Sequence, residues 1–304
     1  MKTVNRQAPK TRRILGRKLE KHRQLHKFST SLYLKYCSLT GFLHVLPDFL
    51  IIGFVKCGTT SLYEYLLQHP YVYPPAGKEI DYFDRLYAKG INWYKVNFPL
   101  KLHKTIVKNL FRKDFVTGEA TPRYIEHPYA LDRIKKIVPN AKFIILLRNP
   151  IDRAFSQYNQ NLNNGYEYLS FEDAIKLEKE RIRERYEKMQ SDETYYSWDY
   201  DLFAYLEHGV YVNKIIRWMN VFPKDQFLIL HSEEFLKNTS VVYHRVLNFL
   251  NLPKWEPIEY SLFKKQTYQK PRIDPALRKQ LVEYFKPHNE RLYKLLGTDF
   301  HWEN

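Results

Sequence analysis

Residues 53–61, with the sequence GFVKCGTTS, combine two glycines, one lysine and three consecutive hydroxyl side chains. Four apolar residues at 49–52 precede this turn, as in a buried parallel strand, and apolar residues recur at helical spacing after it. A turn between a strand and a helix presents backbone amides at the helix N-terminus, where they bind phosphate-like oxyanions. The sequence therefore predicts a phosphate cradle. Its predicted ligands are Lys56, Cys57, Gly58, Thr59, Thr60 and Ser61.

The spacing within this turn departs from that of a nucleotide P-loop. Gly53 and Gly58 are five residues apart, as in a P-loop. In an NTP-binding P-loop, however, a lysine follows the second glycine and the next hydroxyl holds magnesium. Here Thr59 follows Gly58, and Lys56 lies inside the loop, where it can meet charge that develops on a bridging oxygen. We therefore predict group transfer without a metal, and a P-loop kinase or NTPase is the alternative.

A second motif, RNPIDRAFS at 148–156, follows the strongest predicted strand, in AKFIILLRNP. Arg148 would stand at the carboxyl end of that strand, and Ser156 lies eight residues later, about two turns into the next helix. Ligands of open parallel sheets bind outside the carboxyl ends of strands, so Arg148 is expected at the same edge as the cradle. An arginine there can bind a second phosphate through two hydrogen bonds. For Arg153, a phosphate contact and a solvated helix position are both open.

At these two motifs the chain resembles the sulfotransferases that use 3′-phosphoadenosine 5′-phosphosulfate (PAPS). The resemblance is strongest to the heparan-sulfate and carbohydrate branch of that family. There, a K-x-G-T-T/S loop binds the 5′-phosphosulfate and an R-[ND]-P-x-x-R-x-x-S segment binds the 3′-phosphate. In this chain these motifs are residues 56–61 and 148–156. The resemblance runs from about residue 47 to the C-terminus and implies PAPS as donor and 3′-phosphoadenosine 5′-phosphate (PAP) as product.

The resemblance also implies roles on the acceptor side. Glu79, in GKEIDYFD, matches the glutamate that acts as catalytic base, which takes the proton of an attacking hydroxyl. A simple ion pair with Lys78 is the alternative for Glu79, and Glu119 is the second choice for the base. Lys56 would stabilise the departing phosphate oxygen. The segment YSLFKKQTYQKPRIDP takes the place of the loop that covers the donor's adenine and 3′-phosphate. Its candidate ligands are Lys264, Lys265, Thr267 and Tyr268.

Two departures from the family pattern concern the acceptor. Asp81 stands where heparan-sulfate enzymes often have histidine, and Ala120 stands where they often have lysine. Both changes disfavour a heparan-type polysaccharide, and Glu119 would then be free to face the acceptor pocket. A hydroxyl on a carbohydrate is still the predicted acceptor, with a small-molecule or lipid hydroxyl as the alternative.

Elements of two kinds alternate along the chain from residue 47. Strands are predicted in the apolar runs of 49–52, 114–122, 141–150 and 225–235. Helices are predicted at 128–139, 150–162, 171–190, 210–223, 239–252 and 275–297. This alternation predicts an α/β domain over 47–304, with a mainly parallel sheet flanked by helices and a P-loop-like turn after the first strand.

The formal charge of +16 is concentrated at the N-terminus. Residues 1–46 carry eleven Lys or Arg and the single acid Glu20, whereas 47–304 carry 38 basic and 32 acidic residues. We predict that 1–46 is a basic extension, helical or partly disordered. It would either be solvated or contact an anionic surface, a membrane or a polyanion. A nucleic-acid-binding protein is a third alternative, but the body contains no recognisable nucleic-acid module.

The cysteine content and the hydropathy of the chain indicate the cellular compartment. Two cysteines, Cys37 and Cys57, cannot build a disulfide framework, and neither lies in a metal-ligand cluster. No stretch approaches the roughly 20 apolar residues of a spanning helix. These features predict a soluble protein of a reducing compartment, with the cytoplasm preferred to the Golgi lumen and with no metal. They predict nothing about the oligomeric state.

Overall fold

The central sheet is parallel and buried. The computed structural model describes residues 31–112, 114–257, 259–260 and 273–302, and within them the sheet has four strands in the order β2-β1-β3-β4. The strands are β1 (Phe49–Gly53), β2 (Gly118–Glu119), β3 (Lys142–Leu147) and β4 (Phe227–His231). β1 is buried throughout and β3 at every residue after its first, as expected for parallel strands covered on both faces. The predicted α/β fold with a parallel sheet is confirmed.

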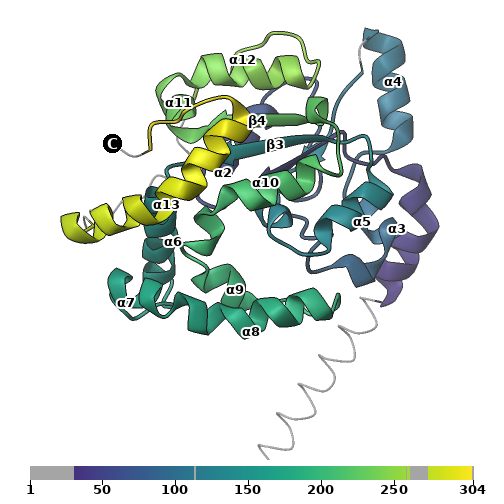
Figure 1. Ribbon diagram of the computed structural model, residues 1–304. Coiled ribbons are helices and arrows are strands. Elements are labelled where there is room, and N and C mark those ends of the chain that lie inside the picture. Colours follow the sequence, from purple (N-terminus) through teal and green to yellow (C-terminus); the bar gives the residue numbers. More distant parts are fainter. Residues whose placement is uncertain (1–30, 113, 258, 261–272, 303–304) are drawn as a thin grey trace, which may run out of the picture.

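Helices pack around this sheet (Figure 1), with α12 above the strands and α10 below them in that view. Helices α7, α8 and α9 lie beyond α10, farther from the sheet. The described helices with labels are α2 (Thr59–Leu67), α3 (Ile91–Lys95), α4 (Lys101–Phe111), α5 (Ala130–Ile137), α6 (Pro150–Asn163), α7 (Phe171–Lys176), α8 (Glu178–Ser191), α9 (Trp198–Phe203), α10 (Tyr211–Met219), α11 (Ser232–Lys237), α12 (Thr239–Phe249) and α13 (Pro275–Leu296). Residues 31–40 are also helical and lead into the 3-10 turn η1 (Gly41–Leu43).

The stretch 171–190 was predicted as one long helix, and this is wrong. It forms α7 and α8, which are separated at Leu177. Glu178 is buried, and its carboxylate accepts hydrogen bonds from the backbone amides of Leu206 (2.7 Å) and Glu207 (2.8 Å). These contacts with a distant segment hold the start of α8, and no local pattern reveals them. The sequence pattern also misses α3, α4, α9 and α11. The strand predicted within 225–235 ends at His231, because α11 begins at Ser232.

The start of α6 follows directly from its sequence. The Asn149 side chain accepts hydrogen bonds from the backbone amides of Ile151 (3.0 Å) and Asp152 (3.3 Å). Pro150 occupies the first helical position, where its missing amide would have no partner in the helix. This cap fixes the point at which the chain leaves β3, and it thereby positions Arg148.

The N-terminal region is only partly described, because residues 1–30 lie outside the described ranges. Among the residues that the structure does describe, no helix is both long and apolar enough to cross a bilayer.

Candidate active site

The predicted cradle lies between β1 and α2. Gly58 is the N-cap residue of α2 and has a φ of 92°, a left-handed conformation that suits glycine. Because glycine has no side chain to cap the helix, the amides of Thr59, Thr60 and Ser61 have no partner within α2. An N-terminus of this kind carries partial positive charge and suits an oxyanion.

The two sequence motifs meet at this turn. The guanidinium Nη1 of Arg148 donates a hydrogen bond to the backbone oxygen of Lys56 over 3.2 Å. Lys56 Nζ in turn donates to Oε1 of Gln160 on α6 over 2.7 Å. Since β1 and β3 are neighbours in the sheet, both motifs stand at the carboxyl ends of adjacent strands. The prediction that Arg148 and the cradle share one sheet edge is confirmed.

Helix α6 presents one face to the cradle. Ser156 and Gln160 are four residues apart and therefore lie on the same side of the helix. Because Gln160 contacts Lys56, the largely buried Ser156 lies on the side of α6 that faces the cradle.

Arg153 is not a solvated helix residue, so that alternative is wrong. Its side chain is fully buried, with 0% exposed. Nη1 donates to Oε1 of Gln157 over 2.7 Å, and Nη2 donates to the backbone oxygen of Tyr205. Arg153 therefore ties α6 to the segment that follows α9.

The side chains of several predicted ligands are buried beneath the turn. Cys57 is 1% exposed, and burial raises the pKa of its thiol to about 11, so the sulfur is protonated and unsuited to nucleophilic chemistry. Its backbone oxygen accepts a hydrogen bond from Ser232 Oγ (2.6 Å), which fastens the loop to the end of β4. The side chains of Thr59 and Ser61 are also buried, whereas Thr60 is half-buried. Cys57 thus contributes to the shape of the turn, and its backbone amide donates to the backbone oxygen of Phe54 over 3.3 Å.

Glu79 lies beside the cradle. Lys78 Nζ donates to Glu79 Oε1 and to Thr60 Oγ1, over 2.8 Å in each case. Arg123 Nη1 is 3.6 Å from Glu79 Oε2. The Glu79 side chain is 32% exposed, which leaves its carboxylate accessible from solvent. The ion pair with Lys78 is therefore present, and it also holds the candidate base next to the first turn of α2.

Glu119 is 0% exposed and does not face an open acceptor pocket, so that expectation is wrong. Its Oε1 accepts hydrogen bonds from the hydroxyls of Tyr94 (2.7 Å) and Tyr124 (3.1 Å). Its Oε2 accepts from Thr121 Oγ1 (2.7 Å) and from the backbone amide of Ile80 (3.1 Å). Burial raises the pKa of this carboxyl to about 7, although the hydrogen bonds act in the opposite direction. Glu119 therefore anchors the segment that carries Glu79.

The arginines near Glu79 already have carboxylate partners. Arg123 Nε is 2.6 Å from Oδ2 of Asp201, a buried carboxylate that also accepts a hydrogen bond from Tyr196. Arg85 pairs with Asp81. The charges of these two arginines are therefore balanced by neighbouring carboxylates.

Sequence reasoning missed three residues of this site. Gln160 follows Ser156 by one helical turn, so helical spacing could have identified it. Arg123 and Asp201 are 78 residues apart, and nothing local to either residue signals their ion pair. The candidate ligands Lys264, Lys265, Thr267 and Tyr268 lie outside the described residues.

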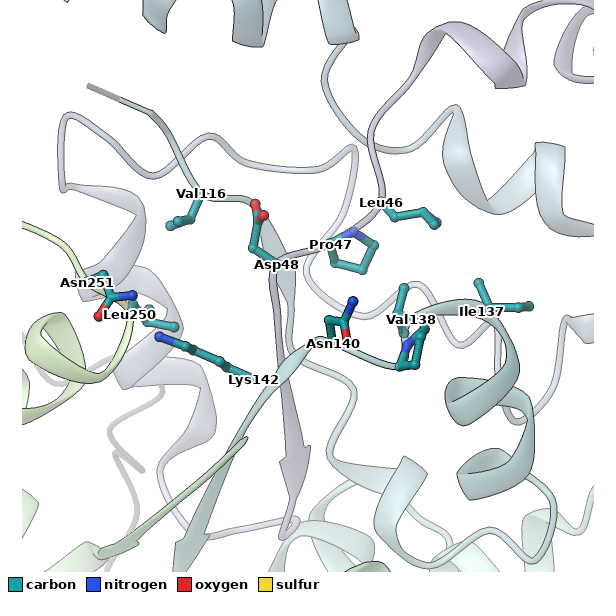
Figure 2. A pocket seen from close by; sticks show the side chains of 12 residues that line it. Leu46, Pro47, Asp48, Val116, Ile137, Val138, Asn140, Lys142, Leu250 and Asn251 are labelled. Carbon is teal, nitrogen blue, oxygen red and sulfur yellow. The ribbon is translucent and has the colours of Figure 1, made fainter. Parts of the chain in front are cut away.

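A cavity of about 440 Å³ opens at the opposite edge of the sheet. Figure 2 shows Asp48, Asn140 and Lys142 among its lining residues, near the amino ends of β1 and β3. Ligands of parallel sheets bind at carboxyl ends, and the described lining includes none of the predicted site residues. This cavity is therefore separate from the site at Lys56 and Arg148.

Comparisons with known proteins agree with the geometry. Residues 46–304 match the family described as the sulfotransferase domain. The chain is 29% identical to the membrane-associated sulfotransferase kil1 of Dictyostelium discoideum, over 87% of this chain and 68% of the relative. It is 28% identical to human heparan sulfate glucosamine 3-O-sulfotransferase 6, over 84% and 73% respectively. The crystal structure of a sulfotransferase from Alicyclobacillus acidocaldarius aligns with a TM-score of 0.65 and 30% identity, over 86% of this chain and 100% of that one.

Proposed function

Because the chain belongs to the sulfotransferase domain family and is a sulfotransferase, we propose that it moves the sulfuryl group of PAPS to a hydroxyl group, on a carbohydrate. The observation that carries this proposal is the hydrogen bond from Arg148 to the backbone of Lys56, which joins the two anion-binding motifs at one sheet edge. The family assignment supports this function over a P-loop kinase or NTPase.

The residues at this edge fit a donor with two anionic ends. The amides at the start of α2 and the ammonium of Lys56 suit the 5′-phosphosulfate. Arg148 and Ser156, on the neighbouring strand end and helix, suit the 3′-phosphate. The two cationic side chains come from adjacent strands, so one extended nucleotide could contact both.

The transfer step divides between Lys56 and Glu79. The acceptor oxygen forms a bond to sulfur as the bond from sulfur to the bridging phosphate oxygen breaks, and the electron pair stays on that phosphate. Lys56 donates a hydrogen bond to this departing oxygen, where negative charge accumulates. Glu79 takes the proton of the attacking hydroxyl. The products are a sulfate ester, PAP and a proton held on Glu79.

We further propose that no metal is needed. In a P-loop NTPase a metal ion neutralises phosphate charge. Here Lys56 and the first-turn amides of α2 can act on the same oxygens directly, and Thr59 stands where the P-loop lysine would be.

Glu79 is our choice for the base. Its carboxylate is partly exposed and is held next to Thr60 through Lys78. Glu119 is already occupied by four hydrogen-bond donors and is closed to solvent, so we assign it a positioning role.

The ion pairs near Glu79 limit the chemical class of the acceptor. Recognition of a carboxylate or sulfate ester usually requires an arginine whose donors are available. Arg123 is engaged by Asp201, and Arg85 by Asp81. We therefore propose a hydroxyl whose immediate surroundings are uncharged, on a neutral sugar or, as the alternative, on a small molecule or lipid.

Two finer proposals concern location. The basic N-terminal segment would contact an anionic surface, and the protein would reside in the cytoplasm. Fractionation of cells that express the tagged full chain tests the second proposal, because recovery in the lumen of an organelle would contradict it.

A transfer assay tests the proposed function. The protein is incubated with radiolabelled PAPS and a chelator, together with matched pairs of glycosides that differ only in a neutral or a carboxylated sugar. We expect label to reach the neutral member of a pair and to require Lys56. Transfer that depends on added magnesium would contradict metal independence, and preference for the carboxylated member would contradict the proposed acceptor.

A further inference from the structure

Large apolar side chains are exposed mainly in two segments of the surface. Within the described residues, eleven of the nineteen exposed large hydrophobic side chains fall in residues 32–43 and 100–110. We call these eleven residues the docking face. They are Leu32, Tyr33, Leu34, Tyr36, Leu39, Phe42, Leu43, Leu100, Leu102, Ile106 and Leu110. Scattered exposed apolar residues are ordinary, whereas a concentration of this kind marks an interaction site.

Helix α4 supplies an apolar stripe that points away from the protein. Leu102, Ile106 and Leu110 recur every four residues, so they share one side of the helix. Their side chains are 67%, 45% and 71% exposed. The helix contacts the body through other residues, because Val107 is buried and Lys104 lies 3.1 Å from Asp48. The stripe is therefore not used in packing the described fold.

Residues 31–43 are attached to the body at few points. Of these residues, Cys37 and Gly41 are buried. Gly41 approaches α3 so closely that a Cβ would lie 2.6 Å from the Cβ of Asn92, and the Asn92 side chain donates to the backbone oxygen of Ser38. Leu39 and its apolar neighbours in this segment are exposed to solvent.

The two segments lie together. His44 pairs with Leu100 in an antiparallel bridge, and the amide of Val45 donates to the backbone oxygen of Pro99 over 3.0 Å. In Figure 1 the purple N-terminal helix and α4 lie along the same side of the molecule, away from α13. The two segments of the docking face are therefore joined where residues 44–45 meet residues 99–100, and they lie along one side of the molecule.

The two segments themselves carry only positive charge, although two of their lysines pair with acids just outside them, Lys104 with Asp48 (3.1 Å) and Lys108 with Asp114 (3.9 Å). Residues 31–46 and 99–112 contain no Asp or Glu, and they carry the basic residues Lys35, Lys101, Lys104, Lys108 and Arg112. Residues 1–30, which directly precede the docking face, contain ten Lys or Arg and one acid. Apolar side chains flanked by lysines and arginines are typical of protein surfaces that lie on anionic bilayers.

We propose that the docking face binds the surface of an anionic lipid bilayer, with its leucine and aromatic side chains at the acyl boundary and its basic residues among the headgroups. A second copy of the chain is less suited, because a two-fold interface would bring the same basic segments together. The proposal deepens and rests on the proposed contact of the N-terminus with an anionic surface, but it does not depend on sulfuryl transfer.

Co-sedimentation of the full chain with vesicles tests the proposal. One set of vesicles contains phosphatidylcholine with about a third phosphatidylserine, and the other contains phosphatidylcholine alone. The test variant combines Leu102→Ser, Ile106→Ser and Leu110→Ser on α4. A matched control combines Leu236→Ser and Val241→Ser, which remove apolar side chains of similar exposure on α11 and α12.

We expect the wild type and the control to bind the anionic vesicles, and the α4 variant to bind at least tenfold more weakly. If the α4 variant fails to fold, Leu39→Ser with Phe42→Ser tests the other segment of the face with the same expected loss. Titration with PAP provides a readout of the fold and of donor binding that is independent of vesicles. Failure of the wild type to bind PAP would therefore count against the proposed function and not against the docking face.

Three results would overturn the proposal. The first is absence of binding by the wild type. The second is binding that is unaffected by the leucine substitutions but abolished by deletion of residues 1–30, which would assign attachment to the basic arm alone. The third is a dimer in light scattering that the α4 variant loses while vesicle binding stays unchanged, which would assign the face to a second copy.

Discussion

Replacing Glu79 with glutamine should separate catalysis from binding. The substitution Glu79→Gln removes the proton acceptor but keeps the shape of the side chain. General-base catalysis contributes typically 10²–10⁴-fold, so kcat should fall by about that factor, equivalent to roughly 3–5 kcal/mol of transition-state stabilisation. Stability should change by less than about 1 kcal/mol, because the ion pair with Lys78 is partly exposed. Donor binding should be unchanged, since Lys56 and Arg148 keep their contacts.

Glu119→Gln is the matched comparison, because it makes the same chemical change at a buried carboxylate. Four donors converge on Glu119, and an amide nitrogen in place of one oxygen leaves at least one of them without an acceptor. An unsatisfied buried donor costs about 1–3 kcal/mol. This variant should therefore melt several degrees lower than the wild type, and kcat should fall only to the extent that Glu79 is displaced.

Steady-state kinetics, PAP titration and thermal melting of both variants distinguish the two roles. A kcat within threefold of wild type for Glu79→Gln would refute its role as base. If Glu119→Gln instead lost most of its activity with an unchanged melting temperature, Glu119 would be the base. A large loss of PAP affinity in Glu79→Gln would make Glu79 part of the donor cradle.

Three further predictions concern other parts of the account. Gly58→Ala should lower stability by about 1–2 kcal/mol and weaken PAP binding, because the backbone φ of 92° is strained for alanine even though the surrounding atoms leave room for a Cβ. Thermal melting measures the first effect and PAP titration the second. An unchanged melting temperature would mean that the turn relaxes at no cost. Asp201→Asn should remove the nearer carboxylate partner of Arg123 and raise kcat/KM for carboxylated acceptors relative to neutral ones. An unchanged ratio in the transfer assay would argue against the proposed acceptor charge. The pKa of Glu119 is raised by burial to about 7, so its contribution to stability is complete below about pH 4.5 and is lost as the pH rises through 7. The stability difference between wild type and Glu119→Gln should accordingly shrink by about 2 kcal/mol from pH 5 to pH 8 in denaturant titrations, and a difference that grows with pH would contradict this sign.

The fold and the meeting of Arg148 with the turn at Lys56 could be predicted because their signals are local. The apolar runs of β1 and β3 identify buried strands without reference to the rest of the chain. Gly58 follows the end of β1 by five residues and Arg148 follows β3 directly, and a parallel sheet places both at one edge. The hydrogen bond between Arg148 and Lys56 is the outcome of that topology.

The surroundings of Glu79 and Glu119 could not be predicted in the same way, because contacts between distant segments determine them. Glu119 is buried by Tyr94 and Tyr124, so its role depends on how three segments pack. Arg123 is neutralised by Asp201, a residue of α9, which the sequence pattern did not predict. Periodicity reports which side of a helix is buried, but it does not report which carboxylate from elsewhere pairs with an arginine.

The central claim is that Lys56 and Arg148 together bind the sulfuryl donor. The most direct test is calorimetric titration of the purified protein with PAP in the presence of a chelator, with ATP plus magnesium as the comparison. We predict binding of PAP without metal, with an affinity that falls about ten- to a hundredfold in Arg148→Ala through loss of a charge-assisted contact. Binding of ATP with magnesium but not of PAP would contradict the claim.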